Sequence, residues 1–360
     1  MSDSGQKNGS PYQGLDARAF WKTGVVEAGG YPPPDLFRPR FSISTEDGIF
    51  TADSCFAQHV GNALKSNGYY VIDAESLPKD TPADVAQKFG YGLFSARFGN
   101  IYTVRQLLQL LQEMTGDFTP AAAIWEKDGR YYDAMRPGVE PAGLEKPEHV
   151  QRARAAHLAA IRQAIEQTEI FVFTLGLTDA WVHTASGTVY PTAPGTIAGE
   201  MDATQFSFRN FRANEIREDF LAVRDILRSF SPHIRFLLTV SPVPLTATAS
   251  DQHVLVASTY SKSVLRTVCG ELYADFDDMD YFPSFEIVSS HIAGASYYSG
   301  NLRSVKPRGV RRVMRAFMQA MGDEANQAIK AAPPSAEPQS AEYDPDDVIC
   351  EEQLLEAFAR

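Results

Sequence analysis

Cysteine is scarce in this chain of 360 residues, which contains only Cys55, Cys269 and Cys350. An odd, widely spaced set without a Cys-x-x-Cys pair excludes a disulfide framework and predicts reduced thiols. The chain also lacks a run of ~20 apolar residues, which excludes a transmembrane helix, and its start lacks the basic and apolar regions of a secretory signal. We therefore expect a cytoplasmic protein without a membrane span.

Positive charge is in deficit, because 33 Lys and Arg residues face 45 Asp and Glu residues, a net charge of -12. This balance disfavours binding to nucleic acid or to an anionic membrane. The glycine-rich phosphate motifs Gly-x4-Gly-Lys-Ser/Thr and Gly-x-Gly-x-x-Gly are absent, so no bound nucleotide cofactor is predicted. The histidines are scattered without metal-ligand spacing, so we expect no metal and no resident cofactor.

Apolar runs alternate with amphipathic segments through the middle of the chain. The apolar runs predict strands at 48–53, 69–72, 170–175 and 235–240. Helical spacing predicts helices at 56–67, 103–115, 147–167, 214–229, 259–273 and 308–322. Strands that are apolar on both faces and alternate with helices are typical of a parallel sheet covered on both sides. The predicted fold class is therefore α/β.

Composition divides the chain into four parts. Residues 1–34 are polar and rich in Gly, Ser and Pro, which predicts a flexible N-terminal arm, and residues 35–325 form the α/β domain. Residues 326–346 have the composition of a linker, and residues 347–360 predict a short amphipathic helix. Whether this helix docks on its own domain, binds a partner or frays is left open by the sequence.

The turns that follow the predicted strands are the places to look for chemistry, because ligands bind at the carboxyl ends of parallel strands. The first such turn is Asp53-Ser54-Cys55, between a strand and a helix. Amides at a helix start lower a thiol pKa and stabilise an oxyanion. The structural alternative is a Ser cap followed by a buried core Cys.

Two further turns have suitable residues. Gly99 allows close backbone approach to a ligand and Asn100 has an amide donor. Gly176-Leu177-Thr178-Asp179 follows the most apolar strand and would face the same crevice as Cys55. Each turn has an ordinary structural interpretation as a capped helix start.

The segment Asp53-Ser54-Cys55-Phe56-Ala57 resembles the motif that names the GSCFA family, with Asp in place of the first Gly. Further family-like segments follow in the right order over residues 35–320: Phe98-Gly99-Asn100-Ile101-Tyr102-Thr103, Thr174-Leu175-Gly176-Leu177-Thr178-Asp179, Leu238-Thr239-Val240-Ser241-Pro242, Ser261-Lys262-Ser263 and Tyr281-Phe282-Pro283-Ser284-Phe285-Glu286. The family in turn resembles the SGNH/GDSL hydrolases. The resemblance implies a three-layer, flavodoxin-like (SGNH-hydrolase-like) parallel sheet with helices on both faces.

The same resemblance implies roles for individual residues. Cys55, rather than Ser54, takes the nucleophile position, because the corresponding block places the nucleophile third. Gly99 takes the position of a backbone oxyanion donor, with Asn100 beside it. In the block that begins at Gly176, Thr178 replaces the expected Asn donor.

The Asp-x-x-His block of those hydrolases is missing, and this chain has Asn301-Leu302-Arg303-Ser304 at the expected place. A serine nucleophile needs a base, whereas a Cys at a helix start is partly ionised without one, so the departure favours Cys55. His59, one helical turn after Cys55, is the first candidate base. Other candidates for the site are His183, Asp179 and, less favoured, His253. Arg303 is interpreted either as an anion-binding residue or as a solvated charge.

The leading hypothesis is an acyltransferase or ester hydrolase with a Cys nucleophile. Family relatives imply a small-molecule or glycan substrate, such as a polysaccharide precursor, and a cytoplasmic location favours acyl-CoA as donor. The alternative is a non-catalytic module, derived from such a hydrolase, that binds a glycan or acyl ligand. The sequence leaves the oligomeric state and the choice between hydrolase and transferase open.

Overall fold

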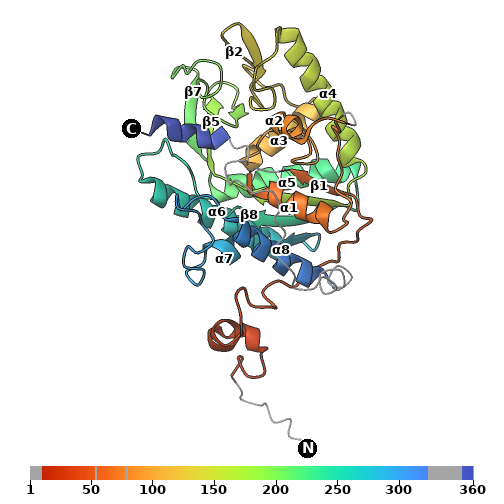
Figure 1. The fold of residues 1–360 in the computed structure, drawn as a ribbon, viewed down its shortest axis with the longest axis vertical. Helices are drawn as coiled ribbons and strands as arrows, with labels where there is room; N and C mark the ends of the chain where they lie inside the picture. Colours follow the sequence, from red (N-terminus) through yellow and green to blue (C-terminus); the bar gives the residue numbers. More distant parts are fainter. Residues whose placement is uncertain (1–9, 53–54, 78–79, 323–350, 360) are drawn as a thin grey trace, which may run out of the picture.

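A parallel sheet lies at the centre of the computed structural model, which describes residues 10–52, 55–77, 80–322 and 351–359 (Figure 1). Its strands are β1 (Ile49–Ala52), β4 (Ile170–Leu175), β8 (Arg235–Val240) and β9 (Met279–Tyr281), in the order β1-β4-β8-β9. All neighbouring pairs are parallel. The predicted α/β class with a parallel sheet is therefore confirmed.

Successive side chains of these strands point to opposite faces of the sheet, as the pleat requires. In β4, Phe171 and Phe173 belong to one hydrophobic cluster, whereas Ile170 and Val172 belong to another. Helices cover both faces because each cluster needs an apolar partner. The first cluster includes residues of α3 (Val104–Thr115), α4 (Pro147–Ile165), α5 (Ala213–Phe230) and α6 (Val254–Asp275); the second includes residues of α1 (Cys55–Ser66), α7 (Ser284–Ser289) and α8 (Pro307–Met321).

The strand predicted at 69–72 is wrong, because this segment makes only a single parallel bridge, between Val71 and Ile49. Ile49 donates to the Tyr70 carbonyl and accepts from the Ile72 amide, both at 2.9 Å. Further along β1, the segment around residue 95 takes over the pairing. Too few backbone partners therefore remain for a ladder at 69–72.

Two small antiparallel sheets were not predicted. One has the order β6-β5-β7, and the other pairs β2 with β3. Their strands are β5 (Asp179–His183), β6 (Val189–Tyr190), β7 (Phe206–Asn210), β2 (Ile124–Lys127) and β3 (Arg130–Asp133). Because β5 begins just after β4 ends, the first of these sheets lies beyond the carboxyl edge of the parallel sheet (Figure 1).

The remaining elements are short helices outside the central layers. They are η1 (Ala17–Ala19), η2 (Lys22–Val26), α2 (Ala83–Lys88) and the C-terminal η4 (Glu351–Phe358). In the portions of the chain described above, no helix combines the length and the apolar composition that crossing a bilayer demands.

Candidate active site

Three segments that are distant in sequence meet at the carboxyl edge of the parallel sheet. Thr51 near the end of β1 donates its N–H to Ser95 Oγ at 2.9 Å, and Ser95 returns a backbone bond to the Thr51 carbonyl. Leu177, after β4, donates its N–H to the Tyr102 carbonyl at 2.8 Å. The segment 94–103 thus joins the end of β1 to the turn after β4, which brings the three predicted turns to one edge.

The first predicted turn leads into α1, which begins at Cys55 shortly after β1 ends at Ala52. Two of the candidate positions, Asp53 and Ser54, lie outside the described residues. His59 belongs to α1, one turn beyond Cys55. The backbone therefore puts Cys55 in the first turn of a helix, where free amides and the helix dipole favour an anion.

The second turn is shaped by Gly99, whose φ of 71° lies in the left-handed region that favours glycine. Asn100 is buried, and its carbonyl accepts from Gln106 Nε2 at 2.8 Å. Thr103 then caps α3, since its hydroxyl accepts from the Gln106 N–H. This cap fixes the segment that contains Gly99 and Asn100.

The turn after β4 is held by two residues of α6 that our sequence analysis did not propose for the site. Lys262 Nζ donates to the Gly176 carbonyl at 2.7 Å, and Ser261 Oγ accepts from the Thr178 N–H at 3.1 Å. Ser261 and Lys262 are both buried. The position of Lys262 on the inward face of a helix could have indicated this role, because lysine is rarely buried without a polar partner. Since the Thr178 N–H is engaged, only its hydroxyl remains for the predicted oxyanion role.

Asp179 begins β5 and lies beside this turn. Its Oδ2 accepts from Thr248 Oγ1 at 2.8 Å, whereas its buried Oδ1 has no hydrogen-bond partner within the described residues. Burial raises the pKa of the Asp179 carboxyl. A partly desolvated carboxyl of this kind is suited to accept a proton from a ligand hydroxyl.

His183, which was also predicted for the site, does not lie beside Asp179. It ends β5, four residues further along an extended strand, or about 13 Å away. Its Nδ1 lies 3.0 Å from Ser186 Oγ. His253 caps α6 by accepting from the Leu255 N–H. Over the portions of the chain that are described, no three His, Cys, Asp or Glu side chains gather as a metal site requires.

Arg303 is buried, with 8% of its surface exposed, which excludes the solvated-charge interpretation. Its Nε donates to the Pro244 carbonyl at 3.2 Å. Pro244 follows β8 in sequence, so this contact brings Arg303 to the carboxyl side of the same sheet. The anion-binding role of Arg303 stays a prediction.

A cavity of about 220 Å³ opens beside the turn after β4. Aromatic and aliphatic side chains dominate its wall, with a few polar groups among them, as is typical of small-molecule sites. Residues of its wall include Tyr102, Leu177, Asp179, Trp181, Phe208 and Leu245. The cavity therefore adjoins the turn after β4 and the start of α3, whereas Gly99 and Asn100 are not part of its wall.

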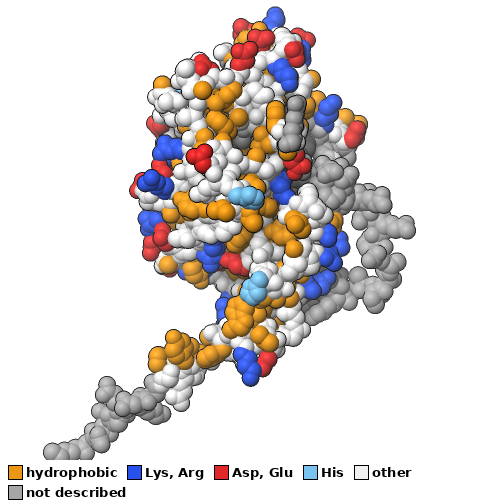
Figure 2. Space-filling view, turned by 90° about the vertical axis from the view of Figure 1, so that its left-hand side faces the viewer, with side chains coloured by type: hydrophobic (Ala, Val, Ile, Leu, Met, Phe, Trp, Pro, Cys, Tyr) orange, Lys and Arg blue, Asp and Glu red, His pale blue; other side chains and the backbone are white. Residues whose placement is uncertain are grey.

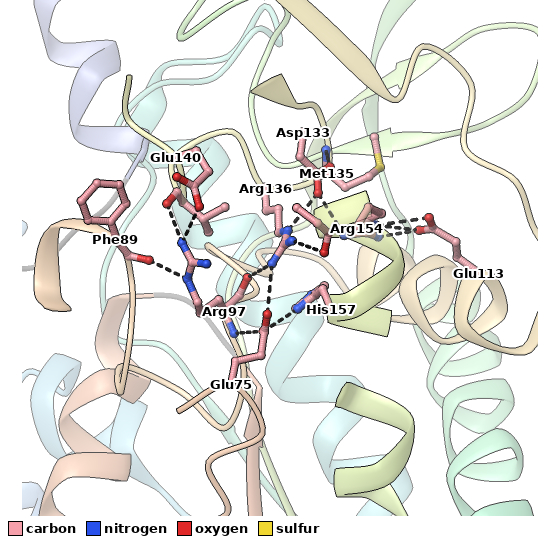
Figure 3. Close-up of polar contacts among 12 residues, drawn as sticks. Glu75, Phe89, Arg97, Glu113, Asp133, Met135, Arg136, Glu140, Arg154 and His157 are labelled. Atoms are coloured by element: carbon pink, nitrogen blue, oxygen red, sulfur yellow. Dashed lines mark hydrogen bonds and ion pairs between the residues drawn. The ribbon is translucent and has the colours of Figure 1, made fainter. Parts of the chain in front are cut away.

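A buried charge network braces the segment that contains Gly99 (Figure 3). The Arg97 N–H donates to Glu75 Oε2 at 2.7 Å, and the Arg97 carbonyl accepts from Arg136 Nη1 at 2.9 Å. His157 Nδ1 lies 2.6 Å from Glu75 Oε2. Both backbone polar groups of Arg97, two residues before Gly99, are thus fixed by the partly buried Glu75 and the buried Arg136.

Of the two titratable groups at the centre of this network, one is neutral and the other is ionised at neutral pH. Burial and the nearby charge of Arg136 lower the pKa of His157 to about 4. Burial alone would raise the pKa of Glu75, but the hydrogen bond with His157 and the charge of Arg136 lower it to about 2. His157 is therefore neutral and donates through Nδ1 to an ionised Glu75.

The free energy of unfolding is expected to fall by roughly 3 kcal/mol as the pH drops from 6.5 to about 4. The unfolded chain protonates its histidine in this range, whereas folded His157 does not, so acid favours unfolding. A further loss of unfolding free energy is expected as the pH falls from 4.5 to about 2. In this range Glu75 becomes protonated in the unfolded chain but stays ionised in the folded one. Urea unfolding at a series of pH values measures how the free energy of unfolding changes with pH in each of the two ranges.

His157→Asn is expected to weaken the pH dependence of the unfolding free energy between pH 6.5 and about 4. The reason is that an amide keeps a donor for Glu75 but does not titrate. The matched control is His149→Gln on the same helix, outside the network, which should retain the slope. An unchanged slope in His157→Asn would contradict the assignment.

The sequence profile of the GSCFA family matches residues 48–317, more than half of the chain. The match runs from β1 into α8 and includes all three predicted turns. A comparison with curated proteins finds no match. The chain therefore belongs to the GSCFA family.

Proposed function

We propose that this chain is an acyl-transfer enzyme, an acyltransferase or ester hydrolase, that uses the Cys55 thiol as nucleophile. The observation that carries the proposal is the start of α1 at Cys55, directly beyond a buried parallel strand. In such a position the thiolate attacks the carbonyl carbon of an ester or thioester, and the alcohol or thiol leaves. The acyl group on sulfur then passes to water or to an acceptor hydroxyl.

The segments that meet β1 supply the other groups that this chemistry needs. Gly99 and Asn100 are proposed to stabilise the oxyanion, together with the Thr178 hydroxyl, and the network around Arg97 holds the first two in place. Lys262 fixes the carbonyl of Gly176 and thereby the conformation of the Thr178 turn. We assign the base role to His59 first, because it lies one turn from Cys55 on α1.

The fold is proposed to be the three-layer, flavodoxin-like fold of the SGNH hydrolases. The bridge at Val71 lies on the far side of β1 from β4, so the order across the sheet is residue 71, β1, β4, β8 and β9. This order is that of flavodoxin-like sheets, 2-1-3-4-5, in which ligands bind at the carboxyl edge.

The cavity is proposed to bind the acyl acceptor, a glycan or polysaccharide precursor. Trp181, Tyr102 and Phe208 offer aromatic surfaces for sugar rings, and Asp179 offers a carboxylate for their hydroxyls. Arg303 is proposed to bind an anionic group of the substrate, and acyl-CoA is proposed as the donor in a cytoplasmic setting.

Alkylation of the three cysteines across pH tests the nucleophile. Cys55 is expected to react with iodoacetamide well below pH 8, because a helix start lowers a thiol pKa. Cys269 should stay unreactive in the folded chain, since it is buried and burial raises its pKa. Mass spectrometry of the three cysteine peptides gives each rate separately.

Cys350 is the internal standard for an ordinary thiol. If Cys55 reacts no faster than Cys350 at every pH, and if neither p-nitrophenyl acetate nor acetyl-CoA leaves an acetyl group on Cys55, the enzyme proposal fails. The non-catalytic binding module would then be the better description.

A further inference from the structure

The C-terminal helix η4 lies against the domain, beside β5 and β7 (Figure 1). Leu355 is half-buried, whereas its neighbour Leu354 is 48% exposed and Phe358 is 67% exposed. The helix is therefore held to the domain by one of its large apolar side chains and leaves the other two in solvent. The face that carries η4 is turned to the viewer in Figure 2, where several groups of hydrophobic side chains lie exposed.

Leu355 contributes to the wall of the cavity described above. The same wall includes Trp181 from β5, Phe208 from β7 and Leu245 from the segment after β8. A leucine side chain from a distant part of the chain thus completes an apolar cavity at the candidate site. Its removal would expose the aromatic wall to solvent.

We propose that η4 is a removable cap on this cavity, with Leu355 as its anchor. A ligand that fills the cavity competes with Leu355 for the same apolar wall, so ligand binding and capping exclude one another at this position. Because one half-buried side chain is a weak anchor, the cap is readily displaced, and low-stability elements of this kind control access to ligand sites in other proteins. The cap makes the cavity accessible only in the fraction of molecules in which η4 has withdrawn.

The quenching of Trp181 fluorescence by acrylamide tests the proposal in the full-length chain. The chain contains three tryptophans, Trp21, Trp125 and Trp181. All variants carry Trp21→Phe, which removes the signal of the exposed Trp21. Trp125 is 4% exposed and contributes a small, constant background. In Leu355→Asp the quenching constant is expected to rise at least about twofold, because withdrawal of η4 uncovers Trp181.

Leu354→Asp is the matched control, with the same substitution on the adjacent, exposed residue. It should leave the quenching unchanged, and Trp181→Phe should abolish the rise seen with Leu355→Asp. A synthetic peptide of residues 347–360 added to Leu355→Asp should restore protection, whereas the same peptide with Leu355→Asp should not.

Equal quenching in the Leu355→Asp, Leu354→Asp and parent chains would overturn the proposal. Restoration by both peptides alike would also overturn it, since Leu355 would then not be the anchor. Circular dichroism verifies that the variants are folded. The readout is access to Trp181 and not turnover, so the result stands whether or not Cys55 proves to be a nucleophile.

Discussion

Replacing Cys55 by alanine is expected to lower kcat/KM for acyl transfer at least about 1,000-fold, with the substrate left bound as well as before. The thiolate is the only proposed group that forms a bond to the acyl carbon, so its loss removes the covalent route. The cavity proposed to bind the acceptor lies beside the turn after β4, and Cys55 is not among the residues of its wall. The measurement is steady-state turnover of an ester or thioester, together with detection of the acyl-enzyme by mass spectrometry.

Cys350→Ala is the control for this variant, since Cys350 lies outside the domain matched by the family profile. It should retain full turnover. Cys55→Ser is expected to be nearly as inactive as the alanine variant, because a helix start favours a thiolate but leaves the far less acidic serine hydroxyl protonated. A Cys55→Ala enzyme that works within a few-fold of the parent would reject the nucleophile assignment.

Arg136→Met is expected to cost about 3–5 kcal/mol of unfolding free energy, the range for breaking a buried ion pair by removing one partner. Arg136 is 3% exposed, and its Nε donates to Asp133 Oδ2 at 2.8 Å. Methionine fills a similar volume but leaves the carboxylates of Asp133 and Glu75 without this cation. It also frees the Arg97 carbonyl, which Arg136 Nη1 holds. Urea unfolding at pH 7 measures the change.

The matched control is Arg152→Met, at an exposed position of α4. Surface substitutions of this kind stay within about 0.5 kcal/mol. A loss below about 1 kcal/mol for Arg136→Met would show that the network is not a stabilising unit. Because Arg97 lies two residues before Gly99, we also expect the Arg136 variant to lose activity beyond what its stability predicts.

Most of the fold was predictable because its signals are local. The strand at 170–175 is apolar at every position but Thr174, and the helix that begins after Thr103 has a cap and helical spacing in one short segment. The strand predicted at 69–72 failed because strands depend on partners elsewhere in the chain. Thr51 pairs with Ser95 in place of that segment, and residues 69–72 do not reveal this choice.

The site was predictable only in part, for the same reason. The turns at Cys55, Gly99 and Gly176 were found from the local strand-to-helix pattern and the family-like motifs. Lys262 was missed as a site residue, because only the packing of α6 against the turn after β4 puts its ammonium on Gly176. The neutral state of His157 could not be predicted from the sequence either, since burial and the charge of Arg136 set its pKa.

The sequence by itself determined the α/β class, the turn that contains Cys55 and the absence of the Asp-x-x-His block, because each depends on neighbouring residues. The tertiary structure decided which side chains meet. It buried Arg303 beside Pro244, separated His183 from Asp179 along β5, and placed Leu355 against the cavity. These outcomes depend on long-range packing, in which the burial of apolar surface and the pairing of buried polar groups are satisfied across the whole chain at once.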